Sequence, residues 1–152
     1  MIIETGGNQR YLFDTNRLRH AVGASQLVWE TTNRWLPDAI HDPGRREGRI
    51  EEVMVASGRA HLLVDDEQVG RELIRRLSLW VLEEAPGLQL TGVVGPRFDP
   101  TREWCPAHGD DPDVFVGALR ATLRRHAQAR AARPPVELRD PMLPWLEPCR
   151  ES

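Results

Sequence analysis

The first 95 residues alternate between short β-type runs and longer runs with helical periodicity. Residues 1–5, MIIET, form an apolar run that ends at Gly6-Gly7, which predicts a first strand followed by a turn. From Asn8 to Leu36 apolar residues recur at steps of three and four, the spacing of an amphipathic helix. We expect this helix to break near Asp14-Thr15, where a side-chain oxygen caps a second segment.

A loop and a β-hairpin are predicted next. Residues 37–50, PDAIHDPGRREGRI, are rich in proline, glycine and arginine and predict an exposed, mobile loop. The segment from Glu52 to Val64 then alternates apolar and polar residues on both sides of Gly58, which indicates two strands joined by a tight turn. We expect the hairpin tip at Ser57 to Ala60.

A long helix and a fourth strand complete this region. Asp65 or Asp66 precedes an apolar helical stripe and is expected to cap it, and Pro86-Gly87 marks its end. The run LQLTGVV, residues 88–94, predicts the strand. The order strand, helix, strand, strand, helix, strand predicts an α+β fold, a ferredoxin-like four-stranded antiparallel sheet with both helices on one face.

The rest of the chain differs in composition. We expect a domain over 1–95, a loop over 96–112, a C-terminal helix over 113–132 and a proline-rich arm or linker over 133–152, where the chain looks cut rather than finished. An arginine-bearing face of the helix favours a solvated surface over nucleotide or nucleic-acid contact. The expected apolar and basic residues of this helix are Phe115, Val116, Leu119 and Leu123, and Arg120, Arg124, Arg125 and Arg130.

Composition narrows the class of protein. The chain has 152 residues, a formal net charge of -3 and 20 basic residues, all arginine, so charge balance alone does not predict nonspecific nucleic-acid binding. Cys105 and Cys149 have neither metal nor disulfide spacing and are expected to be free thiols. No run resembles a signal peptide or a membrane span. We therefore expect a cytoplasmic protein without a membrane role.

Three groups of residues invite a catalytic or metal-binding interpretation and favour a simpler one. HGDD, His108 to Asp111, lies between prolines without flanking strands, so solvated loop carboxylates are expected. VDDE, Val64 to Glu67, precedes a strong helical stripe and is expected to cap it. The five histidines have no mutual metal-ligand spacing and are expected to be surface or packing residues.

One longer stretch resembles a known family. Residues 6–25, GGNQRYLFDTNRLRHAVGAS, are similar to the opening of a palm domain in the large subunit of type III CRISPR effector complexes, and the resemblance continues to about Gly95. The positions that match the family pattern in order are Gln9, Phe13, Thr15, Asn16, Leu18, Arg19, Gly23, Ala24 and Ser25.

The resemblance implies a palm that has lost its catalytic tip. In the family and in the related GGDEF-type cyclases, the hairpin tip carries acids that hold metal ions together with an acid from the first strand. This chain has Ser57, Gly58, Arg59 and Ala60 there, and Glu4 is the weak candidate for the surviving ligand. One carboxylate beside a cation cannot hold two divalent metals. The chain thus resembles the degenerate first palm, which packs against a second palm with an intact motif.

The resemblance also implies a partial nucleotide site. Small residues at Gly23, Ala24 and Ser25, with Asn16 and Arg19 one turn earlier, would contact a nucleotide, although close helix packing explains small residues equally well. No cofactor is expected for the isolated domain, and ATP with Mg²⁺ is expected only in a two-palm assembly. The expected partner is a second palm domain, in the same parent chain or in a partner subunit.

Two other functions stay open at this stage. A ferredoxin-like module could serve protein–protein assembly alone, with no nucleotide role. An active nucleotidyltransferase would have to use HGDD or a site shared by two copies.

Overall fold

The computed structural model describes residues 1–13, 17–99 and 114–133. Within them the fold is α+β, with an antiparallel sheet in the order β2-β3-β1-β4. The elements are β1 (Ile2–Gly6), α1 (Asn8–Phe13), α2 (Leu18–Glu30), the π-helical segment η1 (Thr31–Trp35), α3 (Leu36–His41), β2 (Ile50–Ala56), β3 (Arg59–Val64), α4 (Glu67–Glu84), β4 (Gln89–Val93) and α5 (Val114–Ala131).

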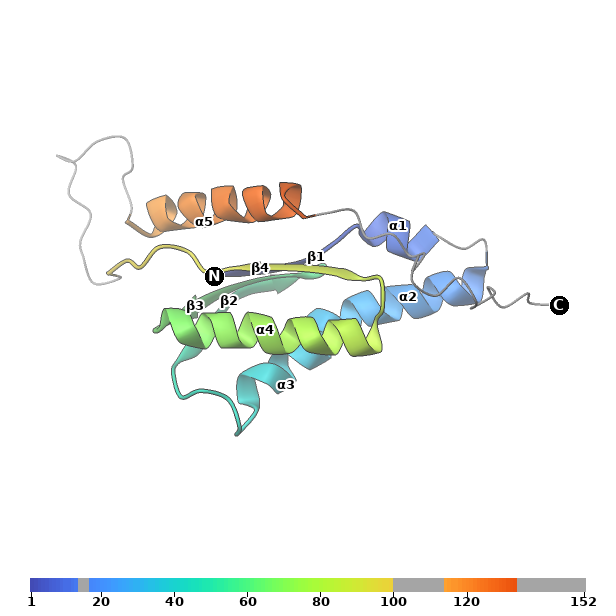
Figure 1. Cartoon of the computed structure of the whole chain (residues 1–152), viewed down its shortest axis with the longest axis horizontal. Helices are drawn as coiled ribbons and strands as arrows, with labels where there is room; N and C mark the ends of the chain where they lie inside the picture. Colours follow the sequence, from blue (N-terminus) through green and yellow to red (C-terminus); the bar gives the residue numbers. More distant parts are fainter. Residues whose placement is uncertain (14–16, 100–113, 134–152) are drawn as a thin grey trace.

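Helices cover both faces of the sheet. Figure 1 shows α4 on one side of the sheet and α5 on the opposite side. Successive side chains of β1 point to opposite faces of the sheet, because side chains alternate in direction along a strand. Ile3 belongs to the main core together with Leu73 and Leu77 of α4, whereas Glu4 contacts Arg130 of α5.

The main core lies between the sheet and the helices that precede β2 and β4. Ile3, Leu36 and Leu77 are completely buried there. Burying an aliphatic side chain of this size stabilises the fold by roughly 1.5–3 kcal/mol relative to leaving it exposed. The other buried members of this cluster are Trp35, Ala39, Ile40, Ala60, Leu62, Leu73, Val81, Ala85, Leu88 and Leu90.

The predicted hairpin is confirmed, with a tighter turn than expected. Only Ser57 and Gly58 lie between β2 and β3, and both have positive φ, 51° and 78°. That backbone pattern is the two-residue turn whose twist suits antiparallel strands. Arg59 and Ala60 therefore belong to β3 and not to the tip.

Gly58 lies against β1 in a space that excludes a side chain. The Thr5 backbone nitrogen donates to the Gly58 carbonyl oxygen at 2.8 Å, and the Thr5 hydroxyl donates to the same oxygen at 3.2 Å. A Cβ atom at position 58 would lie 2.3 Å from Thr5 Oγ1. The turn is thus fixed to the end of β1 by hydrogen bonds that need glycine.

The helical region after β1 is longer than predicted. The expected loop from residue 37 is wrong at its start, because helical structure continues to His41. Pro37 lies in the first turn of α3, directly after the π-helical segment η1, and Leu36 and Ile40 are buried. The start of α2 also differs, since its N-cap is Arg17 without a side-chain cap. The predicted break at Asp14-Thr15 lies outside the described residues.

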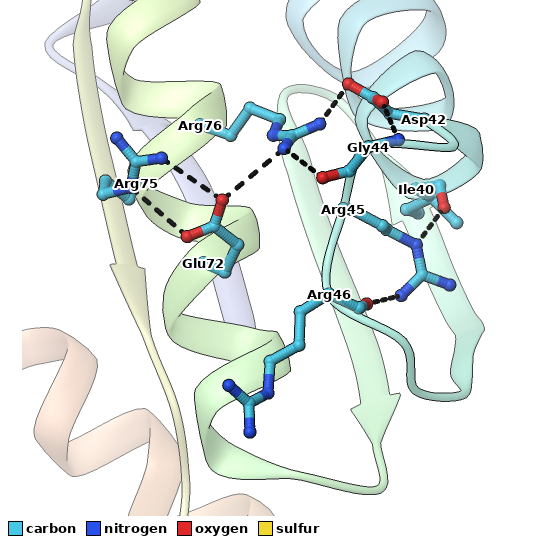
Figure 2. A network of polar contacts seen from close by, with 8 residues as sticks. All are labelled: Ile40, Asp42, Gly44, Arg45, Arg46, Glu72, Arg75 and Arg76. Atoms are coloured by element: carbon cyan, nitrogen blue, oxygen red, sulfur yellow. Dashed lines mark hydrogen bonds and ion pairs between the residues drawn. The ribbon is translucent and has the colours of Figure 1, made fainter.

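Arginine side chains bind the loop between α3 and β2. Figure 2 shows Arg76 of α4 bound to the Asp42 carboxylate and to the Gly44 carbonyl oxygen, the latter at 3.2 Å. Arg45 donates to the Ile40 and Arg46 carbonyl oxygens, at 2.5 and 2.8 Å. Guanidinium groups thus tie the loop to α3 and α4.

The expected second long helix and fourth strand are confirmed. Asp66 caps α4, since its Oδ1 accepts from the backbone nitrogen of Gln68 at 2.6 Å. The helix ends at Glu84, just before Pro86-Gly87, and β4 follows from Gln89. VDDE thus contains a helix cap, as predicted.

Two glycine substitutions should have opposite effects on stability. Gly58→Ala should lower the free energy of unfolding by about 1–3 kcal/mol, because alanine at positive φ is strained and its methyl group meets Thr5. Gly23→Ala, in the middle of α2 with no described atom within 4 Å, should raise it by about 0.5–1 kcal/mol. Urea unfolding of both variants measures this, and an unaffected Gly58→Ala protein would refute the proposed tight contact.

Candidate functional site

The face of the sheet under α5 carries a cluster of charged side chains centred on Glu4. Strand register places Arg59 of β3 and Thr91 of β4 on either side of Glu4. Arg59 donates from Nε to Glu4 Oε2 at 2.8 Å, and its Nη2 lies 2.6 Å from the same oxygen. Arg130 of α5 donates from Nη1 to the other oxygen, Oε1, at 3.1 Å. Glu4 therefore joins a neighbouring strand and a helix from the far end of the chain.

Two histidines border this ion-pair cluster. His126 of α5 is 4% exposed, and its Nδ1 lies 3.8 Å from Glu4 Oε2. Burial lowers the pKa of His126, although Glu4 and a hydrogen bond to the Thr91 backbone act in the opposite direction. Burial also lowers the pKa of His61 on β3, with a further lowering from Arg59. Both rings have a buried Nε2 without a hydrogen-bond partner in the described structure.

Further contacts attach α5 to β4 and the residues after it. Thr122 faces Gly95, where a Cβ atom would lie 1.9 Å from the Thr122 hydroxyl oxygen, so glycine is needed for this approach. Arg125 donates to the Val94 carbonyl oxygen at 3.2 Å. Phe98 and Phe115 pack edge to face with ring centroids 5.7 Å apart. The helix thus closes the half of this face formed by β1 and β4.

The surroundings of Glu4 favour anchoring over metal binding. Two guanidinium groups neutralise the carboxylate and occupy both of its oxygens. A divalent cation would have to displace them and would be repelled by any that remained close. Within the described residues, no group of three or more histidine, cysteine, aspartate or glutamate side chains could hold a metal ion.

The hairpin-tip positions have separate structural roles. Arg59 reaches Glu4, whereas Ala60 is fully buried in the main core on the opposite face of the sheet. Ser57 and Gly58 make the turn. An acid at position 60 would therefore enter the core, and only position 59 faces Glu4.

The predicted nucleotide residues lie on α2 and do not share one side of it. Arg19 and Gly23 are four positions apart and follow one another along the helix. Ser25 is turned by about 120° from Arg19 and about 160° from Gly23, and Ala24 is half-buried. Packing against the described residues does not explain Gly23, because a Cβ atom added there would meet none of their atoms within 4 Å outside the helix's own backbone. Asn16 lies outside the described residues, as do HGDD, Cys105 and Cys149.

A cavity of about 570 Å³ adjoins the Glu4 cluster. It lies between β3 and the N-terminal half of α5, and its lining includes His61, Phe98 and Leu119. The Met1 amino group, which donates to the Leu62 carbonyl oxygen at 2.7 Å, closes part of its wall. This cavity does not include the α2 residues proposed from the sequence.

The sequence predicted His61 and His126 only as surface or packing residues, so their place beside Glu4 and the anchoring role of Arg130 were missed. Strand alternation places His61 on the same face as Arg59 and Glu4, which is a usable signal. For α5, the expected apolar side included Leu123, but Leu123 is exposed and the sheet-facing side continues through Thr122 and His126. The helix was predicted from apolar spacing, and its contact side includes polar residues that such spacing overlooks.

Comparisons with known proteins add no family assignment. No protein-family model matches the chain, and no curated protein matches it significantly. No helix in the described ranges is long and apolar enough to cross a membrane.

Stability should fall on acidification because of His126. Its pKa in the folded protein lies below the unfolded value, so the unfolded state binds more protons at acidic pH. The stability that the neutral ring contributes is complete above about pH 6.5 and is lost as pH falls through the folded pKa. The urea midpoint should therefore drop between about pH 7.5 and 5.5. His126→Asn should flatten this dependence, and an unchanged slope would exclude His126 as its source.

Proposed function

We propose that the chain is a non-catalytic palm domain that acts as a scaffold and supplies half of a nucleotide-binding pocket in a larger assembly. The strand order β2-β3-β1-β4 is the one expected for a ferredoxin-like palm, with a helical crossover after β1 and another after β3. The helices of both crossovers pack in one core on the same side of the sheet. These features support the palm proposal at the level of topology.

The ion pairs of Glu4 are the observation that supports a palm without catalytic activity. A palm that transfers nucleotides needs carboxylates free to hold metal ions near the hairpin tip. Here Arg59 replaces the acid and binds the strand-one carboxylate, while Arg130 of α5 binds its second oxygen. The proposed catalytic face has thereby become a docking face for α5.

The nucleotide part of the proposal rests on α2. Arg19, Gly23 and Ser25 are all exposed on this helix, so a second palm could complete a pocket around them. Arg19 is the strongest phosphate contact among them, because guanidinium donates to two oxygens at once. ATP with Mg²⁺ would then bind between this domain and a second palm in the same parent chain or in a partner subunit.

An interaction module without a nucleotide role is the second candidate function. The observation that favours it is the exposure of large apolar side chains on α2, led by Leu18 at 80%. Such groupings are more typical of protein interfaces than of phosphate sites.

The purified chain should make no linear or cyclic oligonucleotide from ATP or GTP with Mg²⁺ or Mn²⁺. The reason is that the one strand-one carboxylate is held by two arginines. Chromatography of the reaction products measures this, with Glu4→Gln as the matched inactive control. Product that depends on Glu4 would overturn the scaffold proposal in favour of an active transferase.

Arg59→Asp tests whether this face of the sheet has lost a metal-binding site or never had one. This change places two carboxylates across the β1–β3 register. Combined with Arg130→Gln, which removes the second guanidinium from Glu4, it should give measurable Mn²⁺ binding by calorimetry where the parent chain shows none. Ala60→Asp serves as the control, since its carboxylate would face the core and should unfold the protein without creating a site.

A further inference from the structure

The side of α2 that faces solvent carries a continuous apolar stripe. Leu18, Val22 and Trp29 leave 80, 61 and 54% of their surfaces exposed. With Ser25 they occupy positions spaced by four, three and four residues, the spacing of a coiled-coil seam. We call Leu18, Val22, Ser25 and Trp29 the α2 seam. Figure 1 shows this helix extending past the end of the sheet, which leaves it accessible.

The seam is large enough to form the centre of a protein interface. From the usual areas of these side chains, the exposed apolar surface of Leu18, Val22 and Trp29 amounts to roughly 300–400 Å². A stable interface of ordinary size covers about 800 Å² on each partner, with a polar rim around an apolar centre. The seam supplies such a centre.

The seam is complementary to itself when a second copy runs in the opposite direction. A twofold axis between positions 23 and 24 sets Leu18 opposite Trp29 of the second copy and Val22 opposite Ser25 of the second copy. In the second of these pairs a small side chain meets a larger one, so the helices can interdigitate as ridges and grooves do. A parallel arrangement would instead set Trp29 against itself.

The charged residues beside the seam also fit this twofold axis. Arg19 and Glu30 lie on the same side of the seam, and the axis brings Arg19 to within about one turn of Glu30 of the second copy. The reciprocal pair forms as well. Glu30 of the second copy also approaches the N-terminus of α2, where negative charge is favourable and where the first turn has no acid of its own.

We infer that the α2 seam is a homodimer interface in which a second copy of this chain packs its α2 antiparallel across a twofold axis. The small side chain of Ser25 allows the two backbones to approach closely near the centre of the seam. Gly23 lies about 130° around the helix from the seam and takes no part in the pairing. This inference rests on the seam and not on the palm proposal. It assigns Ser25, the small exposed residue of the seam, to helix pairing.

The oligomeric state of the full chain tests the inference. Sedimentation equilibrium should show a concentration-dependent dimer, and Val22→Glu should weaken dimerisation at least tenfold, because two carboxylates then enter the apolar seam. Leu82→Glu is the matched control, since Leu82 is 69% exposed on α4 outside the seam. It should leave the dimer unchanged.

Cross-linking tests the direction of the helices. In a background with Cys105 and Cys149 replaced by serine, a mixture of Val22→Cys and Ser25→Cys proteins should form a disulfide-linked dimer. Leu18→Cys alone should not, because antiparallel pairing separates the two copies of position 18 by about 17 Å along the axis. Efficient Leu18→Cys cross-linking would overturn the antiparallel geometry.

A monomer at every concentration, or a dimer insensitive to Val22→Glu, would overturn the homodimer and leave the seam to a different partner. Neither result bears on the lack of oligonucleotide synthesis, so the scaffold proposal and this inference can fail separately.

Discussion

The carboxylate of Glu4 is the interaction on which the two-sided architecture depends. One of its oxygens binds Arg59 on the neighbouring strand and the other binds Arg130 on α5, so a single side chain joins the sheet to a helix 126 positions away in sequence. Glu4 is only 13% exposed at its side chain. In that setting an unpaired carboxylate would be costly, and the two arginines offset the cost of burying it. The same pairing removes the charge that a metal would need.

Burial of His126 follows from the position of α5. The helix approaches the sheet closely because Gly95 leaves room for Thr122, and this approach takes the next turn of α5, with His126, out of solvent. Its ring nitrogen Nε2 then has no partner among the described residues. A helix, two arginines and a histidine thus partly fill this face of the sheet. We propose that this chain kept the sheet of a palm and put its metal-binding face to structural use.

Patterns among neighbouring residues predicted the helices and strands. They did not predict the contacts between elements that are distant in the sequence. Alternation around Gly58 and the cap at Asp66 follow from neighbouring residues, so the hairpin and α4 were predictable. The continuation of the helix through Pro37 was not predictable from neighbouring residues. Burial of Leu36 and Ile40 outweighed the helix-breaking tendency of the loop residues. The partners of Glu4 depend on strand register and on the packing of α5, neither of which a sequence pattern reveals. The α2 residues were found from the resemblance, but the exposed seam among them became visible only in the structure.

A double-mutant cycle between Glu4 and Arg130 tests whether the Glu4 carboxylate anchors α5. The free energy of unfolding would be measured in urea for the parent chain, Glu4→Gln, Arg130→Gln and the double variant. If Glu4 anchors α5, the two changes should be coupled by about 0.5–2 kcal/mol, above the roughly 0.3–0.5 kcal/mol typical of an exposed helical pair such as Glu67 and Arg71. Additive effects, with no coupling, would contradict the anchoring role and return Glu4 to the position of a candidate metal ligand.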